Sequence, residues 1–557
     1  MNVYFSGLGG VAIGPLSEIA HDAGHTVFGS DLEESLTTKE LRERGFNVVI
    51  GQDGEFLRQT HATTPLDWFV HTAALPANHP ELLAAKELGI RTGKRDEFLA
   101  EFIKDHSLKL IAISGTHGKT TTTGMTVWAL KQLGIPVSYS VGSTLSFGPS
   151  GAYEPGSEYF IYECDEYDKN LLHFSPYLSL LTSIDYDHPD TYPTEEDYKA
   201  TFRQYISQSE KTIAWQRDLD YIAQEPNDTI WSLSDDEQIG IRLLGTHNRR
   251  NATLVYKALD YLGIASESDR MAALVRFPGT DRRFETLTEN LVSDYGHHPE
   301  EIAATLQRAR EGAEKVVLVY QPHQNWRQHF IRDQYTNQFE LAEKIFWLPT
   351  YLTRENPDQP TLTPQDLTIN LTNKESVEYA ELNHSLWNEI QKARDAGYLV
   401  LAMGAGTIDG WVRDQLAVGR TAAVTLTSTD GKVLLQKRDD KPGINNPDML
   451  TAFGGAIEGD ESNRVAALRE LGEETNIDVS WAAERIKYLV TVYQPTTLDG
   501  NPRYITFYSL SDIDPANLEV YEGQGFEAIN PTGDNSGLPL SRPTVEMLET
   551  YNKVHNG

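Results

Sequence analysis

Cysteine is almost missing from this chain, because Cys164 is the only one among 557 residues. A single cysteine excludes an intrachain disulfide framework and a multi-cysteine cage for zinc or an iron–sulfur cluster, which favours a reducing compartment. Long apolar runs are missing too, since no stretch of about 18 apolar residues occurs, and residues 1–5 lack the basic start of an export signal. We therefore expect a cytoplasmic chain that is neither exported nor inserted into a membrane.

Basic residues are scarce relative to acidic ones. The chain has 48 lysines and arginines against 81 aspartates and glutamates, which gives a net charge of −33. Nucleic acids and anionic membranes bind clustered Lys and Arg, so this balance predicts neither of them as a general partner. If the chain binds phosphate groups, they must be bound by local features of the fold rather than by a generally basic surface. Apolar residues at 39% and charged residues at 23% predict a chain that folds.

The length predicts three or four domains at roughly 150 residues each. Short apolar runs alternate with helical stretches through three successive α/β units, each typical of a doubly wound sheet. Strands are expected at residues 2–5, 26–28, 68–70, 108–113, 159–162, 178–184, 291–294, 316–320 and 398–403. A hairpin pattern around Asp430 and Gly431 then predicts a smaller α+β unit. The expected domains are 1–104, 105–285, 286–418 and 419–557.

A glycine turn follows the first expected strand. GLGGVA at residues 7–12 fits G-x-G-x-x-[GA], and Asp31 ends the next strand. In this fingerprint a backbone without side chains lets a diphosphate approach amides at a helix N-terminus. Three interpretations stay open: a nicotinamide dinucleotide, another nucleotide diphosphate, or a tight turn without a ligand.

A second loop, GTHGKT at residues 115–120, follows the buried strand at 108–113 and opens a helix. It has the G-K-T end of a P-loop but lacks a glycine at position 113. Amides at the helix N-terminus would hold phosphates, Lys119 would neutralise the β and γ charges, and the Thr120 hydroxyl would bind Mg²⁺. The loop therefore predicts a site for a nucleotide triphosphate.

Acidic runs follow the next two buried strands of this unit, at residues 163–168 and 185–190. Ligands in open α/β sheets bind at such strand ends, and Mg²⁺ on a nucleotide triphosphate needs only one or two protein ligands. Glu163 and His188 are candidates for that role, although each run by itself is also typical of a solvated loop. Cys164 is expected to be a buried small residue rather than a nucleophile.

Several motifs occur in an order that resembles the Mur ligases of peptidoglycan synthesis. They are the glycine turn, GSD at 29–31, GTHGKTTT at 115–122, the acidic runs, GTHN at 245–248 with Asn251, GTDRRF at 279–284 and DYGHHP at 294–299. The resemblance covers residues 1–415, and within the family it is greatest to members that join L-alanine to UDP-N-acetylmuramate.

The resemblance implies a three-domain enzyme with a UDP-sugar domain, a central ATPase and a domain that receives the amino acid. It implies that ATP activates the sugar acid as an acyl phosphate, which the amine then attacks. The UDP contacts implied are Gly7, Gly9, Gly10, Ser30 and Asp31. The ATP contacts implied are Gly115, Thr116, His117, Gly118, Lys119, Thr120, Thr121, Asn248, Asn251, Arg283 and Asp294. Catalysis is assigned to Lys119, Thr120, Glu163 and His188, the last three also holding Mg²⁺. Each has an ordinary alternative: the two asparagines as helix caps, and Arg283 as a surface ion pair.

The amino-acid pocket implied by the resemblance contains Tyr295, His297, His323 and Arg327. One departure matters here. The family usually has arginine directly after Gln-Pro-His, and this chain has Gln324. A lost guanidinium would weaken bidentate recognition of a carboxylate, so L-alanine is expected but another amino acid or a peptide stays open. Gly296 favours the alanine-adding members.

The last unit resembles the Nudix hydrolases. Gly455, Glu461 and RELGEETNI at 469–477 fit G-x5-E-x7-R-E-U-x-E-E-x-G-U, except that Asn476 replaces a glycine. We expect Asn476 to be tolerated, because asparagine is the next-best residue for a left-handed position after a helix. Arg469 would brace the site against Glu461.

The three carboxylates of this box share one helix face, because Glu470, Glu473 and Glu474 lie at i, i+3 and i+4. Mg²⁺ or Mn²⁺ would relieve their repulsion, polarise a diphosphate and activate water. The implied metal contacts are Gly455, Glu470, Glu473 and Glu474, with Glu473 and Glu474 catalytic. Lys437, Arg438 and Tyr493 are possible substrate contacts. A solvated acidic helix is the ordinary alternative.

The sequence thus predicts an ATP- and Mg²⁺-dependent ligase that adds L-alanine to UDP-N-acetylmuramate, fused to a Nudix hydrolase of an unidentified nucleotide diphosphate. Three alternatives remain. The ligase half takes another amino acid or a peptide, the Nudix half binds a nucleotide without cleaving it, or the chain is a nicotinamide dehydrogenase. The phosphate loop at 115–120 already accounts for nucleotide binding, so the dehydrogenase interpretation is not needed to explain it.

Overall fold

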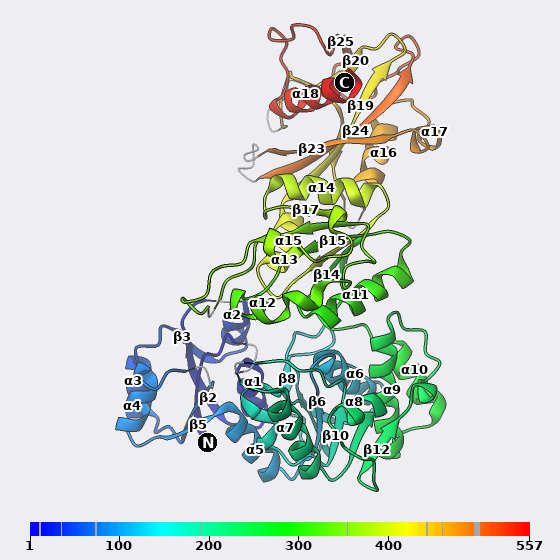
Figure 1. The fold of residues 1–557 in the computed structure, drawn as a ribbon. Coiled ribbons are helices and arrows are strands. Elements are labelled where there is room, and N and C mark those ends of the chain that lie inside the picture. Colours follow the sequence, from blue (N-terminus) through cyan, green and yellow to red (C-terminus); the bar gives the residue numbers. More distant parts are fainter. Residues whose placement is uncertain are drawn as a thin grey trace. The chain divides into compact units, whose positions relative to one another are not determined.

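A computed structural model describes every residue except 11–12, 35, 73–74, 190, 354, 442–443, 459–460, 495–501 and 557. The chain forms two compact units, Met1–Glu285 and Thr286–Gly557. Each unit contains two sheets with helices packed on them (Figure 1). The predicted fold class, three doubly wound α/β sheets and a final α+β unit, is confirmed. The three expected boundaries between the four domains stay a prediction.

The first sheet has the strand order β3-β2-β1-β4-β5, and all neighbours are parallel. Val3 and Phe5 of its central strand pack into one apolar core and Tyr4 into another, so the sheet is covered on both faces. The elements are β1 (Asn2–Ser6), α1 (Gly14–Asp22), β2 (Thr26–Asp31), α2 (Leu36–Glu43), β3 (Asn47–Ile50), α3 (Glu55–Thr63), β4 (Trp68–His71), α4 (Pro80–Glu87), β5 (Arg91–Lys94) and α5 (Arg95–Asp105).

The second sheet has the order β12-β11-β10-β6-β9-β7-β8 and is parallel except for the β7–β8 pair. Its strands are β6 (Lys109–Ser114), β7 (Val137–Ser140), β8 (Gly151–Ala152), β9 (Tyr159–Glu163), β10 (Leu178–Leu181), β11 (Thr212–Trp215) and β12 (Ile230–Leu233). Its helices are α6 (Lys119–Gln132), η1 (Tyr167–His173), α7 (Glu195–Gln208), α8 (Gln216–Tyr221), η2 (Asp235–Glu237), α9 (Thr246–Tyr261) and α10 (Glu267–Val275).

Strand β10 ends at Leu181, three residues before the predicted end at position 184. The cause is a change of partner. The Ser183 carbonyl accepts from the Thr116 amide at 2.8 Å and so leaves the sheet ladder to hold the loop after β6. The end of this strand therefore belongs to the candidate site.

The third sheet, in the second unit, has the order β13-β14-β18-β15-β16-β17. The neighbouring strands from β14 through β18, β15 and β16 to β17 are all parallel. Its strands are β13 (Glu285–Thr288), β14 (Leu291–Asp294), β15 (Val316–Tyr320), β16 (Lys344–Trp347), β17 (Val377–Tyr379) and β18 (Leu399–Met403). Its helices are α11 (Pro299–Gly312), α12 (Asn325–Ile331), η3 (Arg332–Tyr335), α13 (Pro364–Thr368), η4 (Lys374–Ser376), α14 (His384–Asp395) and α15 (Ile408–Ala417).

The fourth sheet is mixed and has the order β21-β20-β19-β24-β23, with β22 on β19 and β25 on β20. The predicted hairpin at Gly431 is confirmed, since β19 and β20 are antiparallel across it. Its strands are β19 (Gly419–Ser428), β20 (Val433–Lys437), β21 (Leu450–Thr451), β22 (Phe453–Ala456), β23 (Lys487–Gln494), β24 (Arg503–Ile513) and β25 (Phe526–Ile529). Its helices are α16 (Asn463–Glu474), α17 (Val479–Ala483) and α18 (Arg542–Asn556).

The third and fourth sheets share an apolar core through helix α14, which lies beside β23 in Figure 1. Tyr504 of β24 is buried in the same core as Trp387 of α14, and its ring stacks on His384 at 5.4 Å between centroids. Tyr493 of β23 lies 5.1 Å from Tyr504. Because aromatic rings contribute large buried areas, the two sheets are expected to unfold together.

Polar side chains seal this junction. Asn463, at the start of α16, donates to Gln391 of α14 at 3.1 Å. The Tyr508 hydroxyl of β24 donates to Asp395 at the end of α14, at 2.8 Å. Burial raises the pKa of Asp395 to about 6, although the Tyr508 hydrogen bond and the Arg394 guanidinium each lower it. The junction thus holds a carboxyl that is costly to ionise.

Asp395→Asn is expected to stabilise the second unit, by an amount that grows with pH. The folded chain keeps the Asp395 proton to about pH 6, whereas the unfolded chain releases it near pH 4. Ionisation therefore costs stability progressively between these values and fully above them. We expect a gain of about 1–3 kcal/mol at pH 7.5 and a smaller gain at pH 5.2, measured by urea unfolding of the whole chain.

The control for this prediction is Asp414→Asn, which changes an exposed carboxyl on α15. A gain for the Asp395 variant that is equal at both pH values would show that packing rather than ionisation explains it.

Candidate functional site

The loop between β6 and α6 can be built only with glycine at two positions. Gly115 has φ +130°, and a Cβ there would lie 2.6 Å from the Ser183 carbonyl oxygen. Gly118 has φ +84°, and a Cβ there would lie 3.0 Å from the Asn251 amide nitrogen. Positive φ disfavours a side chain at both positions, and the segment just after β10 and helix α9 both lie close against the loop backbone.

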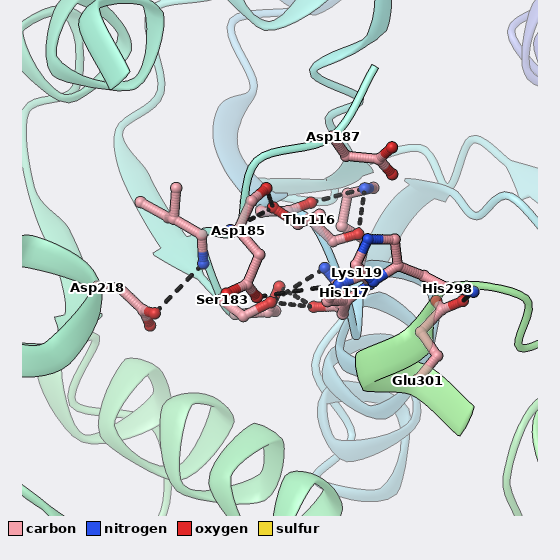
Figure 2. Close-up of polar contacts among 12 residues, drawn as sticks. Thr116, His117, Lys119, Ser183, Asp185, Asp187, Asp218, His298 and Glu301 are labelled. Carbon is pink, nitrogen blue, oxygen red and sulfur yellow. Dashed lines mark hydrogen bonds and ion pairs between the residues drawn. The ribbon is translucent and has the colours of Figure 1, made fainter. Parts of the chain in front are cut away.

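The loop is fixed from the end of β10, as Figure 2 shows. The His117 amide donates to the Ser183 hydroxyl at 3.0 Å, and the Thr116 hydroxyl donates to the Asp185 carbonyl at 2.8 Å. Asp218 in turn accepts from the Ile184 amide at 3.3 Å. These contacts fix the loop that leads directly into the N-terminus of α6. A loop followed by a helix N-terminus is the arrangement that favours a bound phosphate.

Lys119 is held by its own chain. Its Nζ donates to the Gly115 carbonyl at 2.6 Å, to the Thr116 carbonyl at 3.1 Å and to Glu166 at 2.8 Å. Burial by itself lowers the pKa of Lys119, but the Glu166 and Asp165 carboxylates outweigh it and hold that pKa above its ordinary value. Lys119 therefore keeps its charge in a buried site, ready to neutralise an incoming anion.

Glu163 joins α6 to the segment after β7. It accepts from the Thr120 hydroxyl at 2.8 Å and from the Gly142 amide at 2.8 Å. A Cβ on Gly142 would lie 2.9 Å from the Glu163 carboxylate, so a side chain at that position would displace this carboxylate. Thr120 and Glu163, two predicted metal ligands, are thus in direct contact.

His188 lies beside a different carboxylate. Its Nε2 is 3.7 Å from Glu166 Oε1, a buried oxygen without a hydrogen-bond partner. The His188 backbone has φ +56°, which is strained for a non-glycine residue and is typical of functional sites. Glu166 therefore links His188 to Lys119, a connection that sequence reasoning missed.

The two predicted asparagines of α9 differ in role. Asn251 packs against Gly118 of the loop. Asn248, in the first turn of α9, donates to the Leu244 carbonyl at 2.9 Å, but the N-cap residue is Gly245, so Asn248 is not the helix cap of the ordinary alternative. Arg283 follows Thr280, whose carbonyl accepts the Arg283 amide at 3.2 Å.

The glycine turn after β1 closes onto the next strand. The Gly7 and Leu8 amides both donate to the Ser30 carbonyl, at 2.8 and 3.0 Å. The Gly9 amide donates to the Asp31 carboxylate at 2.7 Å. Gly10 donates its amide to Gly7, while the rest of the motif, residues 11–12, lies outside the described residues. Asp31 thus shapes the turn.

A buried carboxylate below this turn was not predicted. Glu81 of α4 accepts from the Tyr4 hydroxyl at 2.7 Å and from the Ser6 hydroxyl at 2.6 Å. Gln52 donates to Ser6 at 3.0 Å and to Ser30 at 3.2 Å. No local signal marks Glu81 or Gln52, because both come from helices or loops far from the glycine motif in sequence.

The second unit brings three of the four predicted amino-acid contacts, Tyr295, His297 and His323, close together. His297 lies 5.5 Å from Tyr295 and 5.4 Å from His323, ring centroid to ring centroid. His323 also stacks on Tyr351 at 5.8 Å, which sequence reasoning missed. Arg327 of α12 is buried. At the end of β14, Asp294 accepts from the Gly296 amide at 2.8 Å.

Gln324, the departure from the family pattern, has φ +61° and gives its amide to the Tyr351 carbonyl at 2.9 Å. The next two amides, of Asn325 and Trp326, donate to the Glu355 carboxylate at 3.0 and 3.1 Å. A carboxylate of the chain itself therefore occupies the start of α12.

The helix α16 of the last sheet carries the predicted carboxylates on one face. Arg469 donates to Glu461 at 2.7 Å, as expected, and also to Glu470 at 2.9 Å and Glu473 at 3.1 Å. A Cβ on Gly455 would lie 2.4 Å from the Glu470 carboxylate. The glycine of the box is therefore needed to admit that side chain.

Glu474 turns inward. One oxygen accepts from Gln436 at 3.1 Å, and the other is buried without a hydrogen-bond partner. Burial raises the pKa of Glu474 to about 8, and the nearby Glu522 and Glu470 carboxylates add to the shift. Arg469 compensates Glu470 and Glu473 only in part, and carboxylate oxygens are the ligands that a divalent cation favours. Glu522 and Gln436 were not predicted.

Comparison with known proteins identifies the ligase part. Residues 2–107 match the family description "Mur ligase family, catalytic domain", residues 113–239 "Mur ligase middle domain", and residues 282–406 "Mur ligase, glutamate ligase domain". A UDP-N-acetylmuramate–L-alanine ligase of Thermosynechococcus vestitus is 31% identical over 455 residues, 74% of this chain and 95% of that protein. The chain belongs to the Mur ligase family.

Further comparisons agree with the family and add the last sheet. The enzyme of the same name from Caldicellulosiruptor saccharolyticus is 30% identical over 451 residues, 73% of this chain and 97% of that protein. The Thermotoga maritima UDP-N-acetylmuramate-alanine ligase has the same fold, with a TM-score of 0.61 at 23% identity over 75% of this chain and 98% of that one. Residues 418–529 match the NUDIX domain.

Two interpretations of this Mur ligase need correction. Tyr493, a possible Nudix substrate contact, packs instead on His384 at 5.6 Å in the junction with the ligase part. Asn476 is not among the described residues with positive φ. Its side chain accepts from the Glu519 amide at 3.0 Å and donates to the Asn517 carbonyl at 2.8 Å, so an amide bridge to the loop after β24 replaces the expected left-handed turn.

The remaining predicted residues of this Mur ligase are consistent with simple local roles. Lys437 pairs with Asp448 at 3.6 Å, and Cys164 is buried, with its pKa raised by burial, which fits an inert thiol. In the described residues, no three His, Cys, Asp or Glu side chains already converge as a metal-binding group, so a cation at α16 would have to draw its carboxylates together. No helix in the described part combines the length and apolar composition needed to cross a bilayer.

Proposed function

We propose that the first 415 or so residues form an ATP-dependent ligase that joins L-alanine to UDP-N-acetylmuramate. The observation that carries this proposal is the buried, charged Lys119 in a glycine loop at the start of α6, in a chain that matches nearly the full length of two alanine ligases. A carboxylate is a poor electrophile, so coupling to an amine needs prior activation.

The chemistry follows from that requirement. The sugar carboxylate attacks the γ-phosphorus of ATP, the bond to the β-phosphate oxygen breaks, and ADP leaves. The amine of the amino acid then attacks the acyl carbon, phosphate leaves, and the amine loses a proton. Lys119 would neutralise charge on the transferring phosphoryl group, and the amides at the start of α6 would hold the phosphates.

Each predicted contact has a place in this proposal. Thr120, Glu163 and His188 would hold Mg²⁺, and their hydroxyl, carboxylate and imidazole donors, with the unpaired Glu166 oxygen nearby, fit that ion. Bound Mg²⁺ would supply charge neutralisation on the phosphates. The remaining ATP contacts proposed are Gly115, Thr116, His117, Gly118, Thr121, Asn248, Asn251, Arg283 and Asp294. The UDP contacts proposed are Gly7, Gly9, Gly10, Ser30 and Asp31. The amino-acid contacts proposed are Tyr295, His297, His323 and Arg327.

We further propose that residues 419–557 hydrolyse a nucleotide diphosphate, with Gly455, Glu470, Glu473 and Glu474 holding Mg²⁺ or Mn²⁺. The raised pKa of Glu474 and its buried oxygen without a hydrogen-bond partner support a cation-binding role for this carboxyl. A domain that only binds nucleotides would not need this set of carboxylates.

The ligase proposal is tested by phosphate release with ATP, Mg²⁺ and UDP-N-acetylmuramate against a panel of amino acids. L-alanine is expected to raise turnover at least about tenfold over glycine and L-serine, because only a true acceptor completes the reaction. Because Gln324 replaces the arginine usual in the family, the second candidate for the acceptor substrate is a different amino acid or a peptide. If another member of the panel, or an alanyl peptide, exceeds L-alanine, the alanine assignment is wrong and the ligase assignment stands.

A further inference from the structure

A cavity of about 210 Å³ opens on the fourth sheet, between its strands and the start of α18. Its floor is made by side chains of β19 and β24, among them Thr421 and Phe507. One wall is the backbone of Gly454 and Gly455 on β22. The cavity is smaller than the 300–1,000 Å³ or so that encloses a whole drug-sized ligand. It therefore fits one end of a substrate.

The charge of this cavity is opposite to that of the chain. Arg438 and Arg503 line it, and none of the described lining residues is Asp or Glu. The chain as a whole has 81 acidic against 48 basic residues. The other polar lining groups include the amides of Asn445, Asn446 and Gln494. Such a set of donors recognises an anionic, hydroxyl-rich group, because arginine pairs with a carboxylate or phosphate.

The cavity offers little to a nucleobase. Phe507 is its only aromatic lining residue among the described ones, and that side chain is 3% exposed within the core. Bases are commonly held by stacking on exposed aromatic rings. The end of the substrate that enters the cavity is therefore the sugar end.

The cavity adjoins the carboxylates of α16. Gly455 lines the cavity, and its Cα faces Glu470 so closely that a Cβ would lie 2.4 Å from the Glu470 carboxylate. Arg438 donates weakly to Gln436 at 3.5 Å, and Gln436 donates to Glu474 at 3.1 Å. A diphosphate held at these carboxylates can thus extend its sugar into the cavity.

We infer that this cavity receives the acidic sugar of a UDP-linked sugar acid, so that the Nudix centre cleaves the class of nucleotide that the ligase half uses. The inference rests on the proposed hydrolase function. In the reaction a water oxygen bonds to one phosphorus and the bond from that phosphorus to the bridging oxygen breaks. The products are UMP and a sugar 1-phosphate, and a proton passes to solvent.

The test compares two substrates that differ mainly in the acid. The whole chain, in the Lys119→Ala background with Mn²⁺ and without ATP, is given UDP-N-acetylmuramate or UDP-N-acetylglucosamine, and UMP release is measured by ion-exchange chromatography. We expect kcat/KM to be about tenfold or more higher for the muramate, because a hydrogen-bonded ion pair contributes on that scale. Arg503→Gln is expected to remove most of this preference, and Arg503→Lys to restore part of it.

The matched control is Arg485→Gln, which changes an arginine paired with Glu484 on the surface of the same sheet unit. A preference for the neutral sugar, or an equal loss on both substrates in Arg503→Gln with an unchanged unfolding midpoint, would overturn the inference. Hydrolysis of ADP-ribose without hydrolysis of either UDP-sugar would overturn it while the hydrolase proposal stands. Failure to cleave any of the three would remove both.

Discussion

Replacing Lys119 by alanine is expected to abolish amino-acid-dependent phosphate release, with a loss of at least about a thousandfold in kcat. The side chain is 14% exposed and fixed by two loop carbonyls and by Glu166, so its charge is delivered at one position. A charge that is already in place costs no reorganisation when the phosphoryl group moves, which is why its removal is costly. The measurement is phosphate release with ATP, UDP-N-acetylmuramate and L-alanine.

The control for this variant is Lys131→Ala, which removes a lysine from the other end of α6, where it donates to the Tyr139 hydroxyl at 3.0 Å. Removing Lys119 also leaves Glu166 without its cation, and the pKa of Glu166 is already raised by burial, so the carboxyl can take up a proton instead. The variant is thus expected to fold. Nudix hydrolysis should be unchanged, and a loss of both activities at an unchanged unfolding midpoint would show that the two sites depend on each other.

The parts of the site that the sequence predicted are those set by local spacing. A glycine turn between strand and helix, a G-K-T loop and carboxylates at i, i+3 and i+4 each define their own geometry within a few residues. The structure confirms the helix face of Glu470, Glu473 and Glu474 and the Arg469 to Glu461 pair for this reason. Strands of the parallel sheets were equally readable, because burial on both faces leaves continuous apolar runs.

The parts that sequence could not give are contacts between distant segments. Glu166 reaches Lys119 across 47 positions, and Gln436 reaches Glu474 across 38. Nothing in either motif specifies these partners, because they follow from strand order and helix packing. Asn476 shows the same limit at one position. It replaces the glycine that usually ends this helix, and its side chain forms hydrogen bonds to residues 517 and 519, which the motif does not specify.

The junction between the third and fourth sheets could not be predicted from the sequence either. It changes how the fusion of the ligase part and the Nudix part is understood. Tyr493 and Tyr504 look like ordinary strand aromatics in the sequence, yet they complete a core with Trp387 and His384. The first residue of α16, Asn463, is bound there by Gln391. The helix that carries the Nudix carboxylates therefore begins on the ligase part rather than on a free appended domain.

Replacing Glu473 by glutamine is expected to lower Nudix hydrolysis by at least about a hundredfold and to leave the ligase reaction unchanged. Glu473 is the exposed member of the three carboxylates, with 60% of its side chain accessible. Its ion pair with Arg469 therefore contributes little to stability, so the variant should unfold at the same temperature as the parent. What it removes is one charged oxygen ligand of the proposed cation, which a neutral amide replaces poorly.

The control for Glu473→Gln is Glu484→Gln, which neutralises another exposed glutamate, paired with Arg485 at 3.1 Å. Hydrolysis is measured as nucleoside monophosphate release over a Mn²⁺ titration, because a lost ligand should raise the Mn²⁺ concentration needed for half-maximal rate, whereas a lost general base would lower the rate at saturating Mn²⁺. Wild-type rates in Glu473→Gln at every Mn²⁺ concentration would mean that the acidic face of α16 is only a solvated surface. A fall in both variants alike would instead reflect the general loss of negative charge around the site, since charge effects of that kind do not depend on which exposed glutamate is removed.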